Sequence, residues 1–301
     1  MSKSVQFGRR STADHVLAGV NLSGKRIVVT GCNTGLGLET LNAFAANGAT
    51  VIGLARTIEA ATRACAQASP LCVPVACDLA DLESVDTAAR AIRDGGAALD
   101  AIVTNAGVAN ITSLSTRYGV EMQFLINHVG HFALVNGITE LLRDDTGRIV
   151  VVSGHASIRD APPDGIMFDN LDGRRFYKAS TFYGQSKLAN ALYAKELSRR
   201  LSSRGIVVNA ADPGPARTRT TTGFFARLFA KSPAQAAATQ AWLAASPQAA
   251  GISGCYWLDC KISEGNPLLG DAVLARRLWD VSEEIAARRE ARDEHSLQQA
   301  A

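Results

Sequence analysis

The stretch Thr30-Gly31-Cys32-Asn33-Thr34-Gly35-Leu36-Gly37 lies between a short apolar run and a segment with helical spacing. The run Ile27–Thr30 is typical of a buried parallel strand, and Leu36–Asn47 follows helical periodicity before Gly48. Glycines at such a junction let the backbone approach a ligand closely, and the start of the helix offers free N–H groups and a positive dipole end. This context predicts a turn that binds the pyrophosphate of a dinucleotide.

Strand-like and helix-like segments alternate along the rest of the chain. Apolar runs predict strands at Thr50–Ala55, Val73–Ala76, Ala101–Thr104, Arg148–Val152, Ile206–Ala210 and Gly254–Leu258. Helical spacing covers Arg117–Leu142, Phe182–Leu201 and Ala272–His295, with a short helix near Thr12–Leu17. The alternation predicts an α/β fold, a single Rossmann-type doubly wound parallel sheet with helices on both faces.

No linker rich in Pro, Gly or Ser divides the chain, so one domain is expected. We assign residues 1–21 to an N-terminal arm and residues 22–262 to a dinucleotide-binding catalytic domain. Residues 263–301 form a C-terminal helical extension packed on the same domain.

Composition excludes several classes of protein. Of 301 residues, 47% are hydrophobic and 20% charged, which is typical of a globular chain. A net charge of +3 without a dense basic stripe argues against nucleic-acid binding. The sequence shows no signal peptide and no apolar run of about 18 residues, so no transmembrane segment is expected. The scattered cysteines predict reduced thiols in a cytoplasmic protein and no metal site.

Tyr183 and Lys187 lie four residues apart within a predicted helix, so their side chains share one face. We expect the neighbouring cation to lower the pKa of the phenol from its usual value of about 10. Such a Tyr can exchange a proton with an alcohol or a carbonyl near neutral pH. The glycine turn would supply the bound dinucleotide that moves hydride beside it.

Arg56 follows the second predicted strand, where chains that bind NAD usually place Asp or Glu for the ribose 2′-hydroxyl. A guanidinium at this position suits a 2′-phosphate, because its donors match phosphate oxygens. The sequence therefore favours NADP(H) over NAD(H).

Together the motifs resemble the short-chain dehydrogenase/reductase superfamily. Besides the glycine turn and the Tyr/Lys pair, the resemblance rests on Asp78-Leu79, Asn105-Ala106-Gly107, Asn127, and Pro213-Gly214 followed by Thr218. A narrower likeness to the retinol-dehydrogenase-like group is carried by residues 127–132, 183–190 and 256–261.

The resemblance implies a role for each matching residue. Tyr183 is implied as the acid or base, Lys187 as its partner and a ligand of the nicotinamide ribose, and Asn127 as the anchor of a proton-relaying water. Thr218 would hold the nicotinamide amide, and Asp78 would contact adenine. The implied cofactor-binding set is Gly31, Asn33, Thr34, Gly35, Leu36, Gly37, Arg56, Asp78, Leu79, Asn105, Ala106, Gly107, Tyr183, Lys187, Pro213, Gly214 and Thr218.

One position departs from the family pattern. Family members commonly end the fifth strand with two serines, and the second donates a hydrogen bond to the substrate oxygen. This chain has Ser153-Gly154. Ser153 is favoured as the substitute donor, because strand ends are placed more rigidly than loops, while Ser157 and His155 stay as alternatives.

Two long segments, about residues 155–181 and 219–231, are expected to shape the substrate pocket. The second holds Phe224, Phe225, Leu228 and Phe229, which suggest a lid over a lipophilic or aromatic carbonyl or alcohol. The same side chains could instead pack on the core or, with Lys231, touch a membrane surface.

The expected function is an NADP(H)-dependent ketoreductase or alcohol dehydrogenase with Tyr/Lys acid–base catalysis. A C=C or imine reductase and a non-catalytic NADP-binding sensor or scaffold are the alternatives. The helices of Asn127 and Tyr183 resemble those that pair subunits in this superfamily, so a homodimer or homotetramer is expected. His128 and His131 are expected as core or interface residues, and Asp212 as a turn former.

Overall fold

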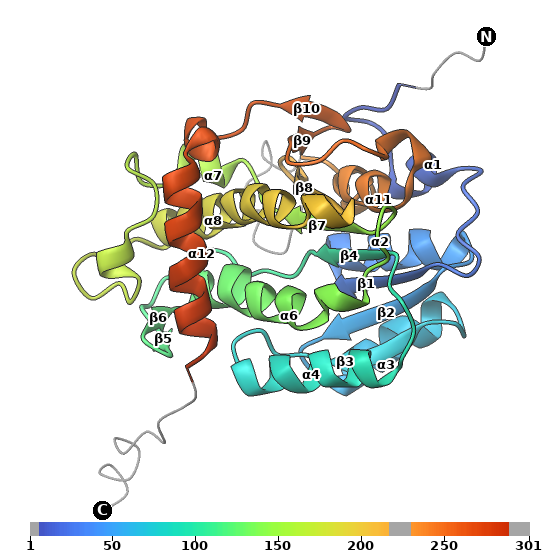
Figure 1. Ribbon diagram of the computed structural model, residues 1–301, viewed down its shortest axis with the longest axis horizontal. Helices are drawn as coiled ribbons and strands as arrows, with labels where there is room; N and C mark the ends of the chain where they lie inside the picture. Colours follow the sequence, from blue (N-terminus) through green and yellow to red (C-terminus); the bar gives the residue numbers. More distant parts are fainter. Residues whose placement is uncertain (1–5, 217–229, 289–301) are drawn as a thin grey trace, which may run out of the picture.

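A mostly parallel sheet of eight strands runs through the molecule in the order β10-β9-β8-β7-β4-β1-β2-β3 (Figure 1). This computed structural model describes residues 6–216 and 230–288. The strands are β1 (Arg26–Thr30), β2 (Thr50–Ala55), β3 (Val73–Ala76), β4 (Ala101–Thr104), β7 (Arg148–Val152), β8 (Val207–Asp212), β9 (Tyr256–Leu258) and β10 (Lys261–Ser263). The order confirms the doubly wound α/β fold predicted from the sequence.

Helices cover both faces of the sheet, as the alternating pattern predicts. One apolar core joins the sheet to α1 (Ala13–Leu17), α2 (Gly35–Ala46), α3 (Ile58–Ala68) and α11 (Ala238–Ala245), which follows α10 (Pro233–Ala236). The opposite face carries α4 (Leu82–Asp94), α6 (Gly130–Ile138), α8 (Ala179–Arg200) and α12 (Ala272–Ala286). The strands between these layers are apolar on both sides because water reaches neither face.

Residues 117–142 do not form the single long helix that the sequence predicts. A two-stranded ribbon of β5 (Thr116–Arg117) and β6 (Val120–Glu121) comes first and turns at Tyr118, whose φ is +55°. The helical part starts as α5 (Met122–Phe124), widens to a π-turn at Leu125–Val129, and continues as α6 and a 3₁₀ turn at Thr139–Leu141. Apolar spacing alone did not reveal this change of helical type.

Several other boundaries differ from the sequence prediction. The strand expected at 206–210 runs to Asp212, and the last strand is followed by β10, which pairs antiparallel with β9 and was not predicted. Helix α12 ends at Ala286, and the rest of the helix expected to reach residue 295 lies partly outside the described residues. The short elements α7 (Ala156–Arg159), η3 (Phe168–Asn170), η4 (Ser202–Arg204), η5 (Pro247–Ala249) and η6 (Pro267–Gly270) join the larger ones.

Helix α12 lies across α6 and α8 (Figure 1). Trp279 stacks edge-on against Phe132 with 4.9 Å between the ring centroids, and the Arg200 guanidinium lies 3.9 Å from the centroid of the Trp279 indole. Helix α12 therefore covers part of the outer surface of α6 and α8, the two helices that were expected to pair subunits.

Candidate active site

The crevice of the sheet lies between β1 and β4, because β2 and β3 follow on one side of β1 and β4 lies on the other. In open α/β sheets, ligands bind at such a crevice, beyond the carboxyl ends of the strands. The glycine turn follows β1 and Asn105 follows β4, so the sheet brings these two segments together. Ser153 and Asp212 stand at the ends of the next two strands, β7 and β8.

The glycine turn is tightly packed on its inner side and open at the start of α2. A Cβ on Gly31, whose φ is +66°, would lie 2.9 Å from the Ala106 Cα, and one on Gly37 would collide with the Gly31 carbonyl oxygen. A Cβ on Gly35 would meet nothing within 4 Å. These contacts require glycine at the two packed positions and leave room for a ligand at the third.

The amino end of α2 has no side-chain cap. Thr34 makes no capping hydrogen bond, and the first turn holds no acidic residue. Asn33, Thr34 and Gly35 are exposed, and Leu36 is half-buried. Free N–H groups at a positive helix end attract phosphate oxygens, so this donor set fits the pyrophosphate of a dinucleotide.

The segment after β4 is fixed to the glycine turn through the Asn105 side chain. The Asn105 amide donates to the Thr30 carbonyl at 3.0 Å and accepts from Gln240 at 2.9 Å. The Asn105 side chain therefore holds the glycine turn in place. The predicted contact between Asn105 and the cofactor stays a prediction. Ala106 is half-buried and Gly107 exposed, beside the turn.

The residues expected at the adenine end lie at the carboxyl ends of β2 and β3. Arg56 follows β2 and is exposed. Asp78 is half-buried and accepts from the Ala80 amide at 3.0 Å, whereas Leu79 is buried against Gly130 of α6. Arg56 and Asp78 are accessible there, and Leu79 serves packing.

Helix α8 carries Tyr183 and Lys187 on one face toward the end of β7. The Lys187 ammonium donates to the Val152 carbonyl at 3.2 Å and lies 5.8 Å from the centroid of the Tyr183 ring. Lys187 is 4% exposed, and Tyr183 is half-buried. The pair therefore faces the end of the sheet where the glycine turn stands.

The expected acidic phenol is not found. Burial, together with the charges of Asp212 and Asp160, raises the pKa of Tyr183 to about 12. Burial also lowers the pKa of Lys187 to about 8. The prediction that Lys187 lowers the pKa of Tyr183 is wrong in this structure, because desolvation and two carboxylates dominate the shift and the cation that opposes them is Arg159.

The Ser153 hydroxyl forms a hydrogen bond within the protein. It donates to the Lys187 carbonyl oxygen at 2.7 Å, and Ser153 is 2% exposed. A hydroxyl has one proton, so Ser153 holds α8 in this geometry instead of serving as the favoured donor. Of the two alternatives, Ser157 is fully buried and His155 is exposed.

Gly154 occupies the donor position of the family pattern. The residue is buried, yet a Cβ added to it would meet nothing within 4 Å. The space next to the strand end is therefore open where other members carry a hydroxyl.

Asn127 lies in the π-turn and links the segment after β4 to α8. Its amide group accepts from the Val108 N–H at 2.8 Å and donates to the Val108 carbonyl at 2.9 Å and to the Ser186 hydroxyl at 2.9 Å. A Cβ on Gly107 would lie 3.0 Å from the Asn127 Oδ1 and 3.5 Å from the Lys187 Nζ. Asn127 thus stands on the same side of the site as Lys187, and its role as the anchor of a proton-relaying water stays a prediction.

The Pro213-Gly214 turn follows β8 and is held by two groups. Asp212 Oδ1 accepts from the Gly214 N–H at 2.7 Å, as expected of a turn former, and its Oδ2 accepts from the Tyr256 hydroxyl at 2.9 Å. Lys231 Nζ donates to the Pro213 carbonyl at 2.8 Å.

The buried position of Lys231 was missed by the sequence analysis. Its side chain is 2% exposed and forms an ion pair with Asp259 at 2.5 Å, so it cannot join a membrane surface as one alternative proposed. Thr218 and the cluster Phe224, Phe225, Leu228 and Phe229 lie outside the described residues. No local pattern marks the Lys231–Asp259 pair, because the two residues meet only in the fold.

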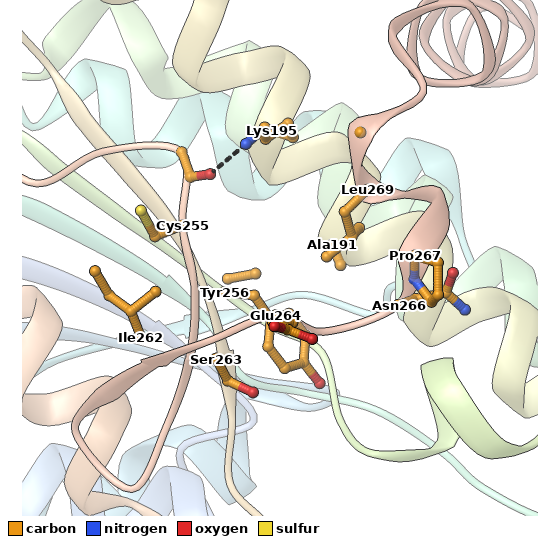
Figure 2. Close-up of a pocket in the computed structure, with 13 residues that line it drawn as sticks. Ala191, Lys195, Cys255, Tyr256, Ile262, Ser263, Glu264, Asn266, Pro267 and Leu269 are labelled. Carbon is orange, nitrogen blue, oxygen red and sulfur yellow. Dashed lines mark hydrogen bonds between the residues drawn. The ribbon is translucent and has the colours of Figure 1, made fainter.

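A separate pocket of about 390 Å³ lies between α8, β9, β10 and η6 (Figure 2). Lys195 and Glu264 contribute charged groups to it, and Lys195 donates to the Gly254 carbonyl at 3.1 Å. Tyr256 lines this pocket with its ring. The residues around the pocket include none of the predicted catalytic or cofactor-binding side chains.

Known proteins resemble this chain over most of its length. A profile described as short chain dehydrogenase matches residues 25–164. Retinol dehydrogenase 14 of Homo sapiens is 36% identical over 293 residues, covering 87% of this chain and 86% of that protein. The chain belongs to the short-chain dehydrogenase family. Its retinol dehydrogenase relatives place it in the retinol-dehydrogenase-like group of this oxidoreductase family, as the motifs predicted.

Two further proteins are similar to this short-chain dehydrogenase, one in sequence and one in structure. The WW domain-containing oxidoreductase of Homo sapiens is 35% identical over 305 residues, covering 94% of this chain and 73% of that protein. The crystal structure of an uncharacterized protein from Mycobacterium paratuberculosis has a TM-score of 0.74 and 29% sequence identity to this chain, covering 91% of this chain and 97% of that protein's chain.

In the described part of the chain, no helix is both long and apolar enough to cross a membrane.

Proposed function

We propose that the protein is an NADP(H)-dependent oxidoreductase that interconverts a carbonyl and an alcohol on a small-to-medium lipophilic or aromatic substrate. The observation that carries the proposal is the placement of Tyr183 and Lys187 on α8 beside the end of β7, where Lys187 reaches the Val152 carbonyl at 3.2 Å. The names of the retinol dehydrogenase relatives support a lipophilic alcohol or aldehyde.

A nicotinamide dinucleotide supplies or accepts the hydride when it is bound. Tyr183 holds the substrate oxygen and donates its proton during reduction. With a pKa of about 12, its phenol stays protonated near neutral pH, which suits the role of general acid. Lys187, with a pKa of about 8, is charged near pH 7 and can return a proton toward Tyr183. Asn127 binds Val108 and Ser186 and so fixes the segment after β4 against α8.

The preference for NADP(H) rests on Arg56. Its guanidinium is exposed directly after β2, at the edge where the ribose of the adenine half is expected. No acidic side chain stands at the end of this strand to hold a ribose 2′-hydroxyl, because the sequence there is Leu54-Ala55-Arg56.

Replacing Arg56 with Ser is expected to weaken NADPH binding about tenfold or more, because a charged hydrogen bond to phosphate contributes about 1.5–3 kcal/mol. NADH binding should change little, since NADH has no 2′-phosphate. Titration of both cofactors by fluorescence measures the two affinities. Arg63→Ser, an exposed arginine on α3, is the matched control. Equal losses for both cofactors would exclude the assigned role.

Carbonyl reduction is expected to slow as pH rises through about 8. The lowered pKa of Lys187 means that its ammonium loses its proton there, whereas the phenol of Tyr183 stays protonated to about pH 12. The relay to Tyr183 then lacks a proton, so kcat/KM for reduction should fall toward one order of magnitude per pH unit. Rates between pH 6 and 10 check this. A profile that stays flat to pH 10 contradicts it.

The proposal is tested by mixing purified protein and NADPH with a panel of lipophilic and aromatic ketones and aldehydes. We expect oxidation of NADPH with formation of the matching alcohol, identified by mass spectrometry. Reduction of enones or imines without attack on simple carbonyls would favour the C=C or imine reductase. NADPH binding with no turnover on any substrate would favour a sensor or scaffold, an alternative raised by the missing second serine.

A cytoplasmic location is part of the proposal. All six cysteines are free thiols, which supports a reducing compartment.

A further inference from the structure

The hydroxyl of Thr30, at the end of β1, is surrounded by three hydrogen-bonding groups. The amides of Asn105 and Ala106 each lie 2.9 Å from its oxygen, and so does the Nε2 of His131. Backbone amides can only donate, so both lone pairs of the hydroxyl accept from them. The single proton of the hydroxyl must then be donated to His131 Nε2.

This assignment fixes the protonation of His131. Its Nε2 accepts, so the ring proton of the neutral imidazole is on Nδ1, which lies 2.9 Å from the Asn127 carbonyl oxygen. That oxygen is an acceptor, so the second hydrogen bond is consistent with the first. His131 is 1% exposed, and burial, with the charge of Lys187, lowers its pKa to about 4. The ring is therefore neutral and in one tautomer.

The hydrogen bonds continue from Asn127 to the catalytic helix. The Asn127 side-chain amide donates to the Ser186 hydroxyl at 2.9 Å, and Ser186 donates to the Tyr183 carbonyl at 2.8 Å. The same amide group binds both backbone groups of Val108. One chain of hydrogen bonds thus runs from the end of β1, through His131, to α8.

We infer that His131 is a positioning residue that fixes the segment 105–108, expected to face the cofactor, against Asn127 and the Tyr183 helix. The buried His131 ring forms its hydrogen bonds with protein groups. It acts by binding Thr30 on one side and the Asn127 carbonyl on the other. The inference rests on the proposed function for its effect on catalysis, but the hydrogen bonds are testable without it.

His128 provides a matched control on the same stretch of chain. It is also 1% exposed, and burial lowers its pKa to about 3. Its Nε2 lies 2.8 Å from the Ser282 hydroxyl, which donates its own proton to the Leu278 carbonyl at 2.7 Å. In this geometry His128 carries its proton on Nε2, the opposite tautomer, and binds α12 through Ser282, while Asn190 of α8 lies beside its ring.

The first experiment is ¹⁵N NMR of the histidine rings in the full chain, with His131→Leu and His128→Leu used to assign the signals. We expect a neutral Nδ1–H ring for His131 and a neutral Nε2–H ring for His128, both unchanged from pH 8 to pH 5. An Nε2–H tautomer for His131, or titration near pH 6.5, would overturn the inference.

The second experiment compares the two leucine variants by hydrogen exchange and NADPH binding. His131→Leu removes the acceptor of the Thr30 hydroxyl proton and the donor to the Asn127 carbonyl, so the Asn105 and Ala106 amides should exchange about tenfold faster, and NADPH should bind about tenfold more weakly. His128→Leu should change neither beyond its effect on overall stability, followed by Tm. Equal changes in both variants would mean that His131 is only a core residue.

If His131→Leu does not fold, Thr30→Val removes the same hydroxyl with little change of shape, and Thr30→Ser restores it. Thr30→Val should reproduce the faster exchange of the two amides and the weaker binding of NADPH, and Thr30→Ser should reverse both. Failure of Thr30→Val to do so would reject the arrangement. Absence of carbonyl reduction in the unaltered protein would reject the proposed function, whereas the tautomer and exchange results would still decide the role of His131.

At saturating NADPH, kcat for carbonyl reduction should fall about tenfold in His131→Leu, with KM for the carbonyl nearly unchanged. An equal fall in His128→Leu would contradict a specific positioning role.

Discussion

Tyr183→Phe is expected to lower kcat for carbonyl reduction about a thousandfold, the middle of the range for loss of a general acid. The exchange removes one hydroxyl and keeps the ring, so the packing of α8 is preserved. NADPH affinity should stay within about fivefold, since one lost hydrogen bond contributes about 1 kcal/mol. Steady-state NADPH oxidation and fluorescence titration measure the two quantities.

Tyr193→Phe is the matched control. Tyr193 lies on the same helix and is buried, but its hydroxyl bonds Asn136 at 3.3 Å and its ring packs on Phe132 and Trp279. This variant should keep nearly full kcat while showing a similar small change in Tm. If Tyr183→Phe retains more than about a tenth of kcat, Tyr183 is not the general acid. If both variants lose activity equally, the effect comes from the helix and not from the hydroxyl.

The parts of the site that the sequence predicts well are those encoded within a few residues. The glycine turn is one example, because strand, glycines and helix follow each other directly at residues 26–46. Tyr183 and Lys187 are another, since a helix places residues four apart on one face whatever surrounds it. The doubly wound α/β architecture follows in the same way from alternating strands and helices, although the strand β10 does not.

The parts that the sequence predicts poorly depend on residues that meet only in the fold. The pKa of Tyr183 is an example: Lys187 is its neighbour in sequence, but burial and the charges of Asp212 and Asp160 determine the shift. Lys231 is another, because its partner Asp259 comes from the end of β9. Burial and distant carboxylates outweigh any local charge at Tyr183, and the ion pair of Lys231 joins residues far apart in the sequence.

Residues 117–142 show a third kind of limit. Apolar spacing there is helical throughout, yet the ribbon turns at Tyr118 and Glu121 caps α5 by accepting from the Gln123 and Phe124 amides at 2.9 and 3.0 Å. The π-turn that follows contains Asn127, whose carbonyl accepts from His131 at the start of α6. Hydrophobic periodicity does not report such a local change in hydrogen bonding.

The missing donor at residue 154 leads to a prediction of a gain in activity. Ser153 donates to the Lys187 carbonyl at 2.7 Å, and a side chain on Gly154 would enter open space. In other enzymes, loss of one such donor lowers kcat about 10²–10³-fold. Gly154→Ser restores a hydroxyl at the family position. We expect kcat for carbonyl reduction in Gly154→Ser to be at least about tenfold higher than in Gly154→Ala. This gain is smaller than the 10²–10³-fold loss seen in other enzymes, because packing does not hold the new serine side chain in one rotamer.

Gly154→Ala is the necessary reference, because it adds the same Cβ and carries any backbone cost of replacing a glycine at φ +159° without adding a donor. Both variants should show the same Tm and the same NADPH affinity, so that a difference in kcat reports the hydroxyl alone. Ser153→Ala separates the competing explanation: if Ser153 were the true donor, this variant would lose about a hundredfold in kcat and Gly154→Ser would gain nothing. Because the Ser153 hydroxyl donates to the Lys187 carbonyl, we expect kcat to rise in Gly154→Ser and to fall only modestly in Ser153→Ala.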